Sequence, residues 1–478
     1  MKTILVFTFQ FAVIVAPCQS FNVRFDSGGW PVHDEAFSIE KIPEGFILSC
    51  GTLTENKSDQ QINFVGMDED GEVDWIKVYG TNDETEYSGW ANSMNWVNDS
   101  LIVQGGSIDS DPWILTLAIN GDTLTSYRIT DSLFNPLYHA SLGWNNTLLG
   151  VGTYELDENT YYYGQAICIS VDGVYNWFQS YSSTQYAISL RSVLTTSDFG
   201  YLFGGFALSS NDDNEFDRLI IKTDSLGNEQ WRKRWGSDWD DGFAHLTNTS
   251  DGKYAVCSWA ASEYEMGNFH PPRPYMAKLD TSGEIIWENR YGGFNYPTYL
   301  TKIVETQDGN FVSAGLRSVA GEERGLIIKA DGETGDSTWY RIYSFVDGLE
   351  ENYDCMFRDI IETEDGSLVA CGYVDPTPGY PSRDTWVMKV DSMGCLVPGC
   401  NVSILENQQQ ANFLCYPNPA SQFLNIYLET QSFNFQSSIF NLYNMEGELV
   451  KCFEPMKTEQ LTCSMFLHWL LDVTYFNT

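Results

Sequence analysis

The sequence has few basic side chains: its 478 residues include 26 Lys and Arg against 65 Asp and Glu, a formal net charge of -39. A surface this acidic repels phosphate backbones and anionic membrane faces, which excludes nucleic acid as a partner. Histidine is also scarce, with 5 residues and no pair at zinc-site spacing. The 11 cysteines show neither metal-ligand spacing nor a dense disulfide framework.

Long apolar runs are missing too, so we expect no transmembrane segment. The N-terminus has one Lys, an apolar run over residues 4–15 and a small-residue exit ending at Ser20. These features predict a secretory signal peptide over residues 1–20, with Phe21 as the mature N-terminus. A lipoprotein signal using Cys18 is the alternative, although Pro17 stands where such signals have a small residue.

In place of helical periodicity, the sequence has a repeat of about fifty residues. Each copy has an Asp-Gly-type turn, an apolar strand, a polar loop, a second apolar strand ending in Asp, and a Gly turn. In residues 308–343 it reads DGNFVSAG, GLIIKAD and TGDSTWYRIY. Other copies cover 44–80, 99–129, 146–181, 198–236 and 251–292, and a seventh begins at Asp365.

After the Gly turn, most copies place a Trp and a second aromatic residue at regular spacing. Five Trp lie four residues after a Gly, and an aromatic residue follows four further on: Trp75/Tyr79, Trp177/Tyr181, Trp231/Trp235, Trp287/Tyr291 and Trp339/Tyr343. Residues four apart share one face of a strand, so each pair is predicted to pack between neighbouring sheets. The second copy departs, with Thr125 and Ile129, and should be the least well packed.

Four short β-rich runs in each of seven copies predict an all-β fold, a seven-bladed β-propeller over residues 21–400. The seventh copy has Pro398 where a Trp is expected, so its outer strand is missing. The segment Phe21–Phe25, with aromatic residues four apart before a Gly turn, is predicted to supply it. This closes the ring and removes an open sheet edge.

After a Gln- and Asn-rich linker at 401–412, the phrases YPNPA (416–420), FLNI (423–426) and YNMEGELV (443–450) follow in order. They resemble the type A C-terminal sorting domain of type IX secretion cargo in Bacteroidota, whose secreted proteins also share the blade repeat. The resemblance implies a small Ig-like β-sandwich over 413–478 and the outer-membrane translocon as a partner. Its motif residues here are Tyr416, Pro417, Asn418, Pro419, Asn425 and Gly447.

The end of the chain departs from that family. The family closes with a Gly-Tyr strand and a basic strand, but residues 452–478 match neither, so the domain is degenerate after about residue 451. This puts the efficiency of export in doubt.

One ring of polar residues is the candidate ligand site. Alignment of copies two to seven on the turn before their second strand places Asn92, His139, Ser192, His245, Lys302 and Asp359 at one position of the innermost strand. One side chain per blade would line the axial channel and could hold a ligand or an ion. The alternative is that the ring is polar only because such channels are filled with water.

Metal and catalytic signatures are weak. Asp68-Glu69-Asp70-Gly71 and residues 211–215 have oxygen ligands suited to Ca²⁺, but neither fits a twelve-residue calcium loop. We therefore expect solvated turns and no cofactor, with Ca²⁺ as the open alternative. No nucleophile elbow, phosphate loop, dinucleotide fingerprint or sialidase-type Asp box is present, and no adjacent Cys pair of the quinoprotein type.

The sequence favours a monomeric, secreted or cell-surface propeller that binds an extracellular protein or glycan as a scaffold module. The alternative is an extracellular propeller enzyme, either a polysaccharide hydrolase or lyase or a quinoprotein-like oxidoreductase. A convergent cluster of carboxylates or Arg with perturbed pKa values at one mouth of the channel would favour the enzyme. A broad apolar and aromatic face would favour binding.

Overall fold

The computed structural model describes most of residues 20–396 and four strands beyond them. The residues it leaves undescribed are 1–19, 28–32, 54–59, 81–85, 88–92, 99–100, 110, 131–136, 156–161, 210–215, 262–270, 293–295, 320, 346–353, 376–382, 397–411, 417–424, 430–439, 444–448 and 454–478. The chain separates into two compact units, of which the first ends with Leu396 and the second contains the described residues from Asn412 onward.

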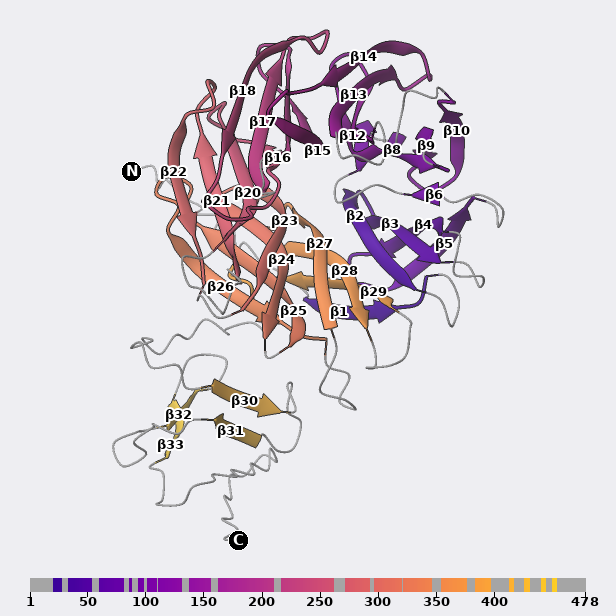
Figure 1. Ribbon diagram of the computed structural model, residues 1–478. Coiled ribbons are helices and arrows are strands. Elements are labelled where there is room, and N and C mark those ends of the chain that lie inside the picture. The colour runs from indigo at the N-terminus through magenta and orange to yellow at the C-terminus, as the bar shows by residue number, and fades with distance from the viewer. Residues whose placement is uncertain are drawn as a thin grey trace, which may run out of the picture. The chain divides into compact units, whose positions relative to one another are not determined.

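The first unit is a ring of seven antiparallel sheets, arranged as the blades of a β-propeller (Figure 1). The described residues form no helix. This confirms the predicted fold class. We find no helix in the described part of the chain that is long and apolar enough to span a membrane.

The blades follow one another along the chain, each running from its innermost strand outward. Blade one consists of β2 (Asp34–Ile42), β3 (Gly45–Leu53), β4 (Gln60–Asp68) and β5 (Val73–Tyr79). Blade two consists of β6 (Glu86–Tyr87), β7 (Met94–Asn98), β8 (Leu101–Ile108), β9 (Asp111–Ala118) and β10 (Thr123–Arg128), and both β6 and β7 pair with β8. Blade three consists of β11 (Leu137–Leu142), β12 (Thr147–Glu155), β13 (Tyr162–Ser170) and β14 (Tyr175–Tyr181).

Blades four to six keep the same order. They consist of β15 (Tyr186–Thr195), β16 (Tyr201–Ser209), β17 (Phe216–Thr223) and β18 (Glu229–Trp235); β19 (His245–Asn248), β20 (Tyr254–Ala261), β21 (Pro272–Leu279) and β22 (Ile285–Arg290); and β23 (Thr298–Glu305), β24 (Phe311–Val319), β25 (Glu322–Ala330) and β26 (Ser337–Tyr343).

Blade seven joins the two ends of the ring. It contains β27 (Asp354–Glu362), β28 (Leu368–Asp375) and β29 (Asp384–Val390), with β1 (Phe21–Phe25) as its outermost strand. Phe21 pairs with Lys389 just as Trp339 pairs with Lys329 in blade six, so Phe21 occupies the position of the repeated Trp.

An aromatic ring of the outer strand covers the Gly turn of the next blade at every junction except that between blades six and seven, where Gly394 meets the Arg341 side chain and the Tyr343 hydroxyl. A Cβ added at Gly227 or Gly283 would lie 2.7 Å from the ring of Trp177 or Trp231. In the divergent second copy, Tyr127 takes this role and covers Gly173 from two residues further along the strand than Thr125. This packing between blades is what the aromatic spacing predicts.

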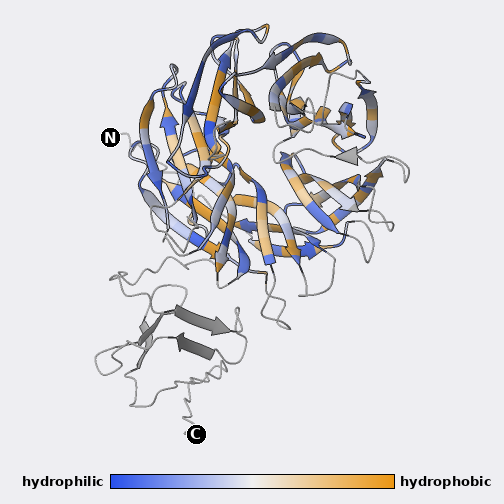
Figure 2. Ribbon diagram, viewed as in Figure 1, coloured by the Kyte–Doolittle hydropathy of each residue, from blue (hydrophilic) through white to orange (hydrophobic). Residues whose placement is uncertain are grey.

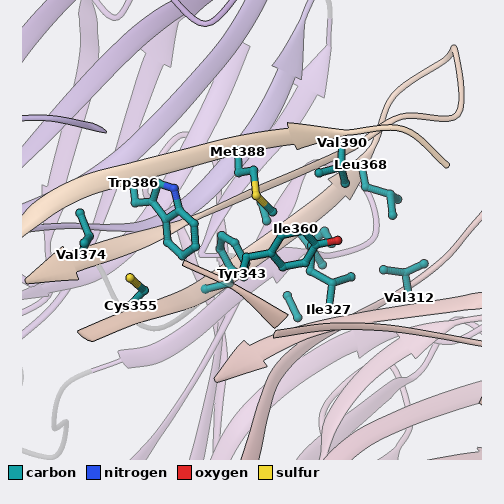
Figure 3. Close-up of a cluster of buried hydrophobic side chains, with 13 residues drawn as sticks. Val312, Ile327, Tyr343, Cys355, Ile360, Leu368, Val374, Trp386, Met388 and Val390 are labelled. Carbon is teal, nitrogen blue, oxygen red and sulfur yellow. The ribbon is translucent and has the colours of Figure 1, made fainter. Parts of the chain in front are cut away.

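The hydrophobic core lies between successive blades, where both faces of each sheet are covered. Figure 2 shows the apolar residues concentrated on the strands of the ring. Figure 3 shows one such cluster, in which Ile327 and Tyr343 of blade six meet Trp386 and Met388 of blade seven. Nearly all of these side chains are fully buried.

A second repeated feature is a buried lysine on the third strand of four blades. Lys329 lies 2.7 Å from Asp308 in the turn before the second strand, and Thr306 also donates to Asp308. The equivalent pairs are Lys222–Asp198, Lys278–Asp251 and Lys389–Asp365. The Asp of each Asp-Gly-type turn therefore anchors a lysine within its own blade.

The second unit contains two described hairpins, β30 (Asn412–Tyr416) with β31 (Asn425–Glu429) and β32 (Phe440–Tyr443) with β33 (Leu449–Phe453). Tyr416 and Asn425 of the sorting motif pair in register. Pro417, Asn418, Pro419 and Gly447 lie outside the described residues, so the β-sandwich remains a prediction.

Candidate functional site

The predicted polar ring occupies one register of the innermost strands. His139, Ser192, Lys302 and Asp359 each follow a bulge in their strand, and His245 begins β19. Asn92 lies outside the described residues.

Two serines complete the register. Met94 pairs with Gln104, and the Ser93 carbonyl accepts the amide of Gly105, which assigns the second-blade position to Ser93 and not to Asn92. Ser38 in blade one, also just after a bulge, is a member that the sequence alignment missed.

The ring side chains bind the next blade. His139 Nδ1 accepts the amide of Val193 at 3.3 Å, and Ser192 Oγ accepts that of Leu246 at 3.1 Å. Asp359 of blade seven accepts the amide of Ile39 at 3.1 Å and the hydroxyl of Ser38 at 3.2 Å. The ring therefore ties neighbouring blades together, and its use as a ligand site stays a prediction.

The ring is charged on one side of the axis. Lys302 Nζ lies 3.8 Å from Asp359, and burial raises the pKa of Asp359. Glu40, which the sequence analysis did not single out, has its pKa raised to about 8 by burial and by the nearby Asp359. Burial and the charge of Lys302 lower the pKa of His245 to about 3 and that of His139 well below its usual value.

A second group of polar residues lies on the face where the innermost strands begin. It comes from blades six, seven and one, from residues at or near strand ends together with Arg358 in the middle of β27. We call it the mouth cluster: Glu35, Glu323, Asp354, Arg358, Tyr373, Asp375 and Arg383. In an antiparallel blade, the starts of the first and third strands and the end of the second lie on one side. The fold therefore gathers these residues at one end of the ring axis.

The mouth cluster is tied by charge and stacking. Glu35 Oε2 binds Arg358 at 3.1 Å and Arg383 at 3.3 Å, and Arg383 also lies 3.4 Å from Asp375. The Arg383 guanidinium stacks 4.0 Å from the centre of the Tyr373 ring. Tyr373 donates its hydroxyl to Glu323 at 3.1 Å, so the Tyr373 ring is held from both sides.

Asp375 is the titratable group that stands out. Burial raises its pKa to about 6, Arg383 opposes the rise, and the carboxylates of Asp354, Glu323 and Glu35 add to it. Asp375 is thus protonated in part near neutral pH, while it remains partly open to solvent. A carboxyl in this state can donate or accept a proton.

No sequence motif predicted the mouth cluster. Arg358 and Glu35 are 323 residues apart, and each belongs to a different blade. The cluster exists because ring closure brings residues of the first and last blades together, and no local spacing in the sequence indicates that. The convergence of carboxylates and arginines is the feature that we expected of an enzyme, and it also places hydrogen-bond donors and acceptors side by side, as a binding site for a polar ligand requires.

The calcium candidates behave as turns. Asp68 Oδ1 accepts the amides of Asp70 and Glu72, and Glu69 binds Lys41. Residues 211–215 lie outside the described residues. Within the described part of the chain, no group of three His, Cys, Asp or Glu side chains could hold a metal ion.

No family model and no curated protein matches the chain. Among solved structures, similarity extends to a protein of unknown function from Dyadobacter fermentans, at 11% identity and a TM-score of 0.44 over 78% of this chain and 99% of that one. The polysaccharide lyase Uly1 is similar at 12% identity and a TM-score of 0.45, over 76% of this chain and 90% of that one. Chaetomium thermophilum Sqt1 is similar at 13% identity and a TM-score of 0.44, over 79% of this chain and 98% of that one. Likeness at this level carries no argument about function.

Proposed function

We propose that this propeller binds a neutral, hydroxyl-rich extracellular ligand, a glycan, at the mouth cluster. One observation carries the proposal: Glu35 holds two arginines beside a stacked tyrosine, so that N–H donors and carboxylate acceptors stand side by side. Neighbouring sugar hydroxyls both donate and accept hydrogen bonds, which suits such a surface. The net charge of -39 disfavours polyanionic glycans.

A glycan array with the purified protein tests this proposal, with Arg383→Met as the test variant. Arg383→Met removes both ion pairs and the stack on Tyr373. Arg128→Met is the matched control, since Arg128 also bridges two aspartates but lies in blade two. We expect saturable binding of neutral glycans by the wild type and the control, and at least a tenfold weaker affinity for Arg383→Met. Binding of proteins alone, or of uronic-acid polymers in preference, would overturn the proposal.

A second candidate is an acid–base enzyme acting on the same ligand, and the raised pKa of Asp375 favours it. In that case Asp375 would supply a proton and a neighbouring carboxylate would act as base. Incubation of bound glycans with the wild type and with Asp375→Asn separates the two functions. Product release that Asp375→Asn abolishes supports the enzyme, and retained binding without product supports the binding module.

We further propose that the protein acts outside the cell, after removal of residues 1–20 and export through the type IX translocon. The support is the sequence pattern at both ends of the chain. Deletion of residues 413–478 should leave the propeller inside the cell envelope, and immunoblots of culture medium, cell surface and periplasm would show it. Unchanged delivery of the truncated chain would refute this route.

A further inference from the structure

A group of buried oxygen atoms lies between blades seven and one, beneath the mouth cluster. Asp34 and Thr52 are cross-strand partners in blade one, and Asn63 is the partner of Cys50 two residues before Thr52. Alternate residues of a strand share a face, so these three side chains point the same way. We call Ser27, Asp34, Thr52 and Asn63 the seam oxygen group.

Ser27, in the segment that joins blade seven to blade one, links the group. Its amide donates to Asp34 Oδ2 at 3.0 Å, and its carbonyl accepts from Asn63 Nδ2 at 2.8 Å. All four residues are buried, Asp34 and Asn63 completely. The carboxylate of Asp34 also adds to the raised pKa of Cys50, which is caused mainly by burial, so Asp34 lies close to that face.

Two of these oxygens have no hydrogen-bond partner among the described residues. Asn63 Oδ1 and Thr52 Oγ1 are buried and accept or donate no hydrogen bond within the described part of the chain. A buried polar atom left in this state costs about 1–3 kcal/mol unless a water or an ion binds it. The amide orientation of Asn63 is set by the Ser27 carbonyl, so its free atom is the oxygen, an acceptor.

We propose that the seam oxygen group binds a hard cation, Ca²⁺ or Na⁺, through the Asp34 carboxylate, Asn63 Oδ1, Thr52 Oγ1 and the Ser27 carbonyl. Carboxylate, amide, hydroxyl and carbonyl oxygens are the ligands that such cations prefer. A neutral water would satisfy the hydrogen bonds, but a cation is also attracted directly by the buried Asp34 carboxylate, and this attraction is strong in low-dielectric surroundings. With one carboxylate, we expect weak Ca²⁺ affinity, about 10⁻⁴–10⁻³ M, as in extracellular modules.

At this position a bound cation would stabilise the junction between the first and last blades. The Asp34 amide donates to the Arg383 carbonyl at 2.8 Å, and Glu35 is the residue that binds both mouth arginines. A cation on Asp34 would therefore brace the seam between the first and last blades and hold Glu35 and Arg383 in place. This inference stands independently of the ligand proposed for the mouth cluster.

The test uses the purified full chain, stripped with a chelator, and follows CaCl₂ and NaCl titrations by calorimetry and by the midpoint of thermal unfolding. Thr52→Val removes one ligand oxygen at nearly constant shape. Thr385→Val is the matched control, a buried threonine at the same interface whose hydroxyl lies 3.9 Å from Cys50 Sγ. We expect a rise in the wild-type midpoint with one of the cations, an affinity at least fivefold weaker in Thr52→Val and an unchanged affinity in Thr385→Val.

Two results would overturn the proposal. The first is a wild-type protein that responds to neither cation, which would mean that a water fills the site. The second is a cation response that Thr52→Val and Thr385→Val share with the wild type, which would place the ion elsewhere. Because Thr52→Val keeps the side-chain volume, loss of folding does not obscure the outcome.

Discussion

The ring of Phe21 lies against Gly71, where an added Cβ would come within 2.7 Å of it. Phe21 belongs to the last blade and Gly71 to the first, so this contact packs these two blades together, while the pairing of β1 with β29 closes the ring without a covalent link. Phe21 also meets Phe46 edge-on, with ring centres 6.3 Å apart.

We expect Phe21→Ala to lower the free energy of unfolding by about 3 kcal/mol, because a buried aromatic ring and its packing between the last and first blades are both lost. Urea unfolding followed by tryptophan fluorescence measures the change. Tyr175→Ala is the control, since Tyr175 lies on an outer strand and is 52% exposed. An unchanged midpoint for Phe21→Ala would show that ring closure does not depend on this contact.

Gly283 should resist substitution more than Gly309. Both have positive φ, 79° and 77°, so an alanine costs backbone strain of about 1–2 kcal/mol at either position. Only Gly283 lies under a ring, 2.7 Å from Trp231, whereas an added Cβ at Gly309 meets nothing within 4 Å. Gly283→Ala should therefore lower the thermal midpoint further than Gly309→Ala, and equal losses would argue against aromatic docking between blades.

Glu40 should make the propeller less stable as the pH rises. Its pKa is raised from 4.5 to about 8 in the folded chain, so the unfolded chain loses the proton first and stability falls between these pH values. Glu40→Gln cannot ionise, and we expect it to exceed the wild type by about 1 kcal/mol or more at pH 8. Unfolding midpoints of both proteins at pH 5 and pH 8 would test this, and parallel midpoints would contradict it.

Acid should act through the repeated Lys–Asp pairs. Burial alone would raise the pKa of Asp308, but hydrogen bonds from Lys329, Thr306 and Asn310 bring it below 3.8. A carboxyl group with a lowered folded-state pKa contributes stability that is complete above its unfolded-state pKa. This contribution is lost as the pH falls through the folded-state pKa. Asp308→Asn should be less stable than the wild type at pH 7 and lose less on acidification, as circular dichroism at stepped pH would show.

The control for the acid experiment is Asp336→Asn, a change in an exposed turn of the same blade. If it alters the acid response as much as Asp308→Asn does, the buried lysine is not the cause.

The repeat alone determined the number of blades, the aromatic packing between them and the part that Phe21–Phe25 plays in the last blade. These features depend on local patterns: Gly turns, strands of period two, and aromatic residues four apart on one face. The sequence alignment also placed His139, Ser192, His245, Lys302 and Asp359 in one register. It missed Ser38 and chose Asn92 where the register has Ser93. In β7 a bulge lies between Trp96 and Asn98, and such an extra residue shifts the pairing by one position.

Only the tertiary structure decided the sites. Glu35 and Arg358 meet because the ring closes, and Ser27 and Asn63 meet because the joining segment crosses the seam. The raised pKa values of Glu40 and Asp375 come from burial among charges of other blades. Convergence and desolvation are properties of the closed ring, and no spacing along the chain encodes them.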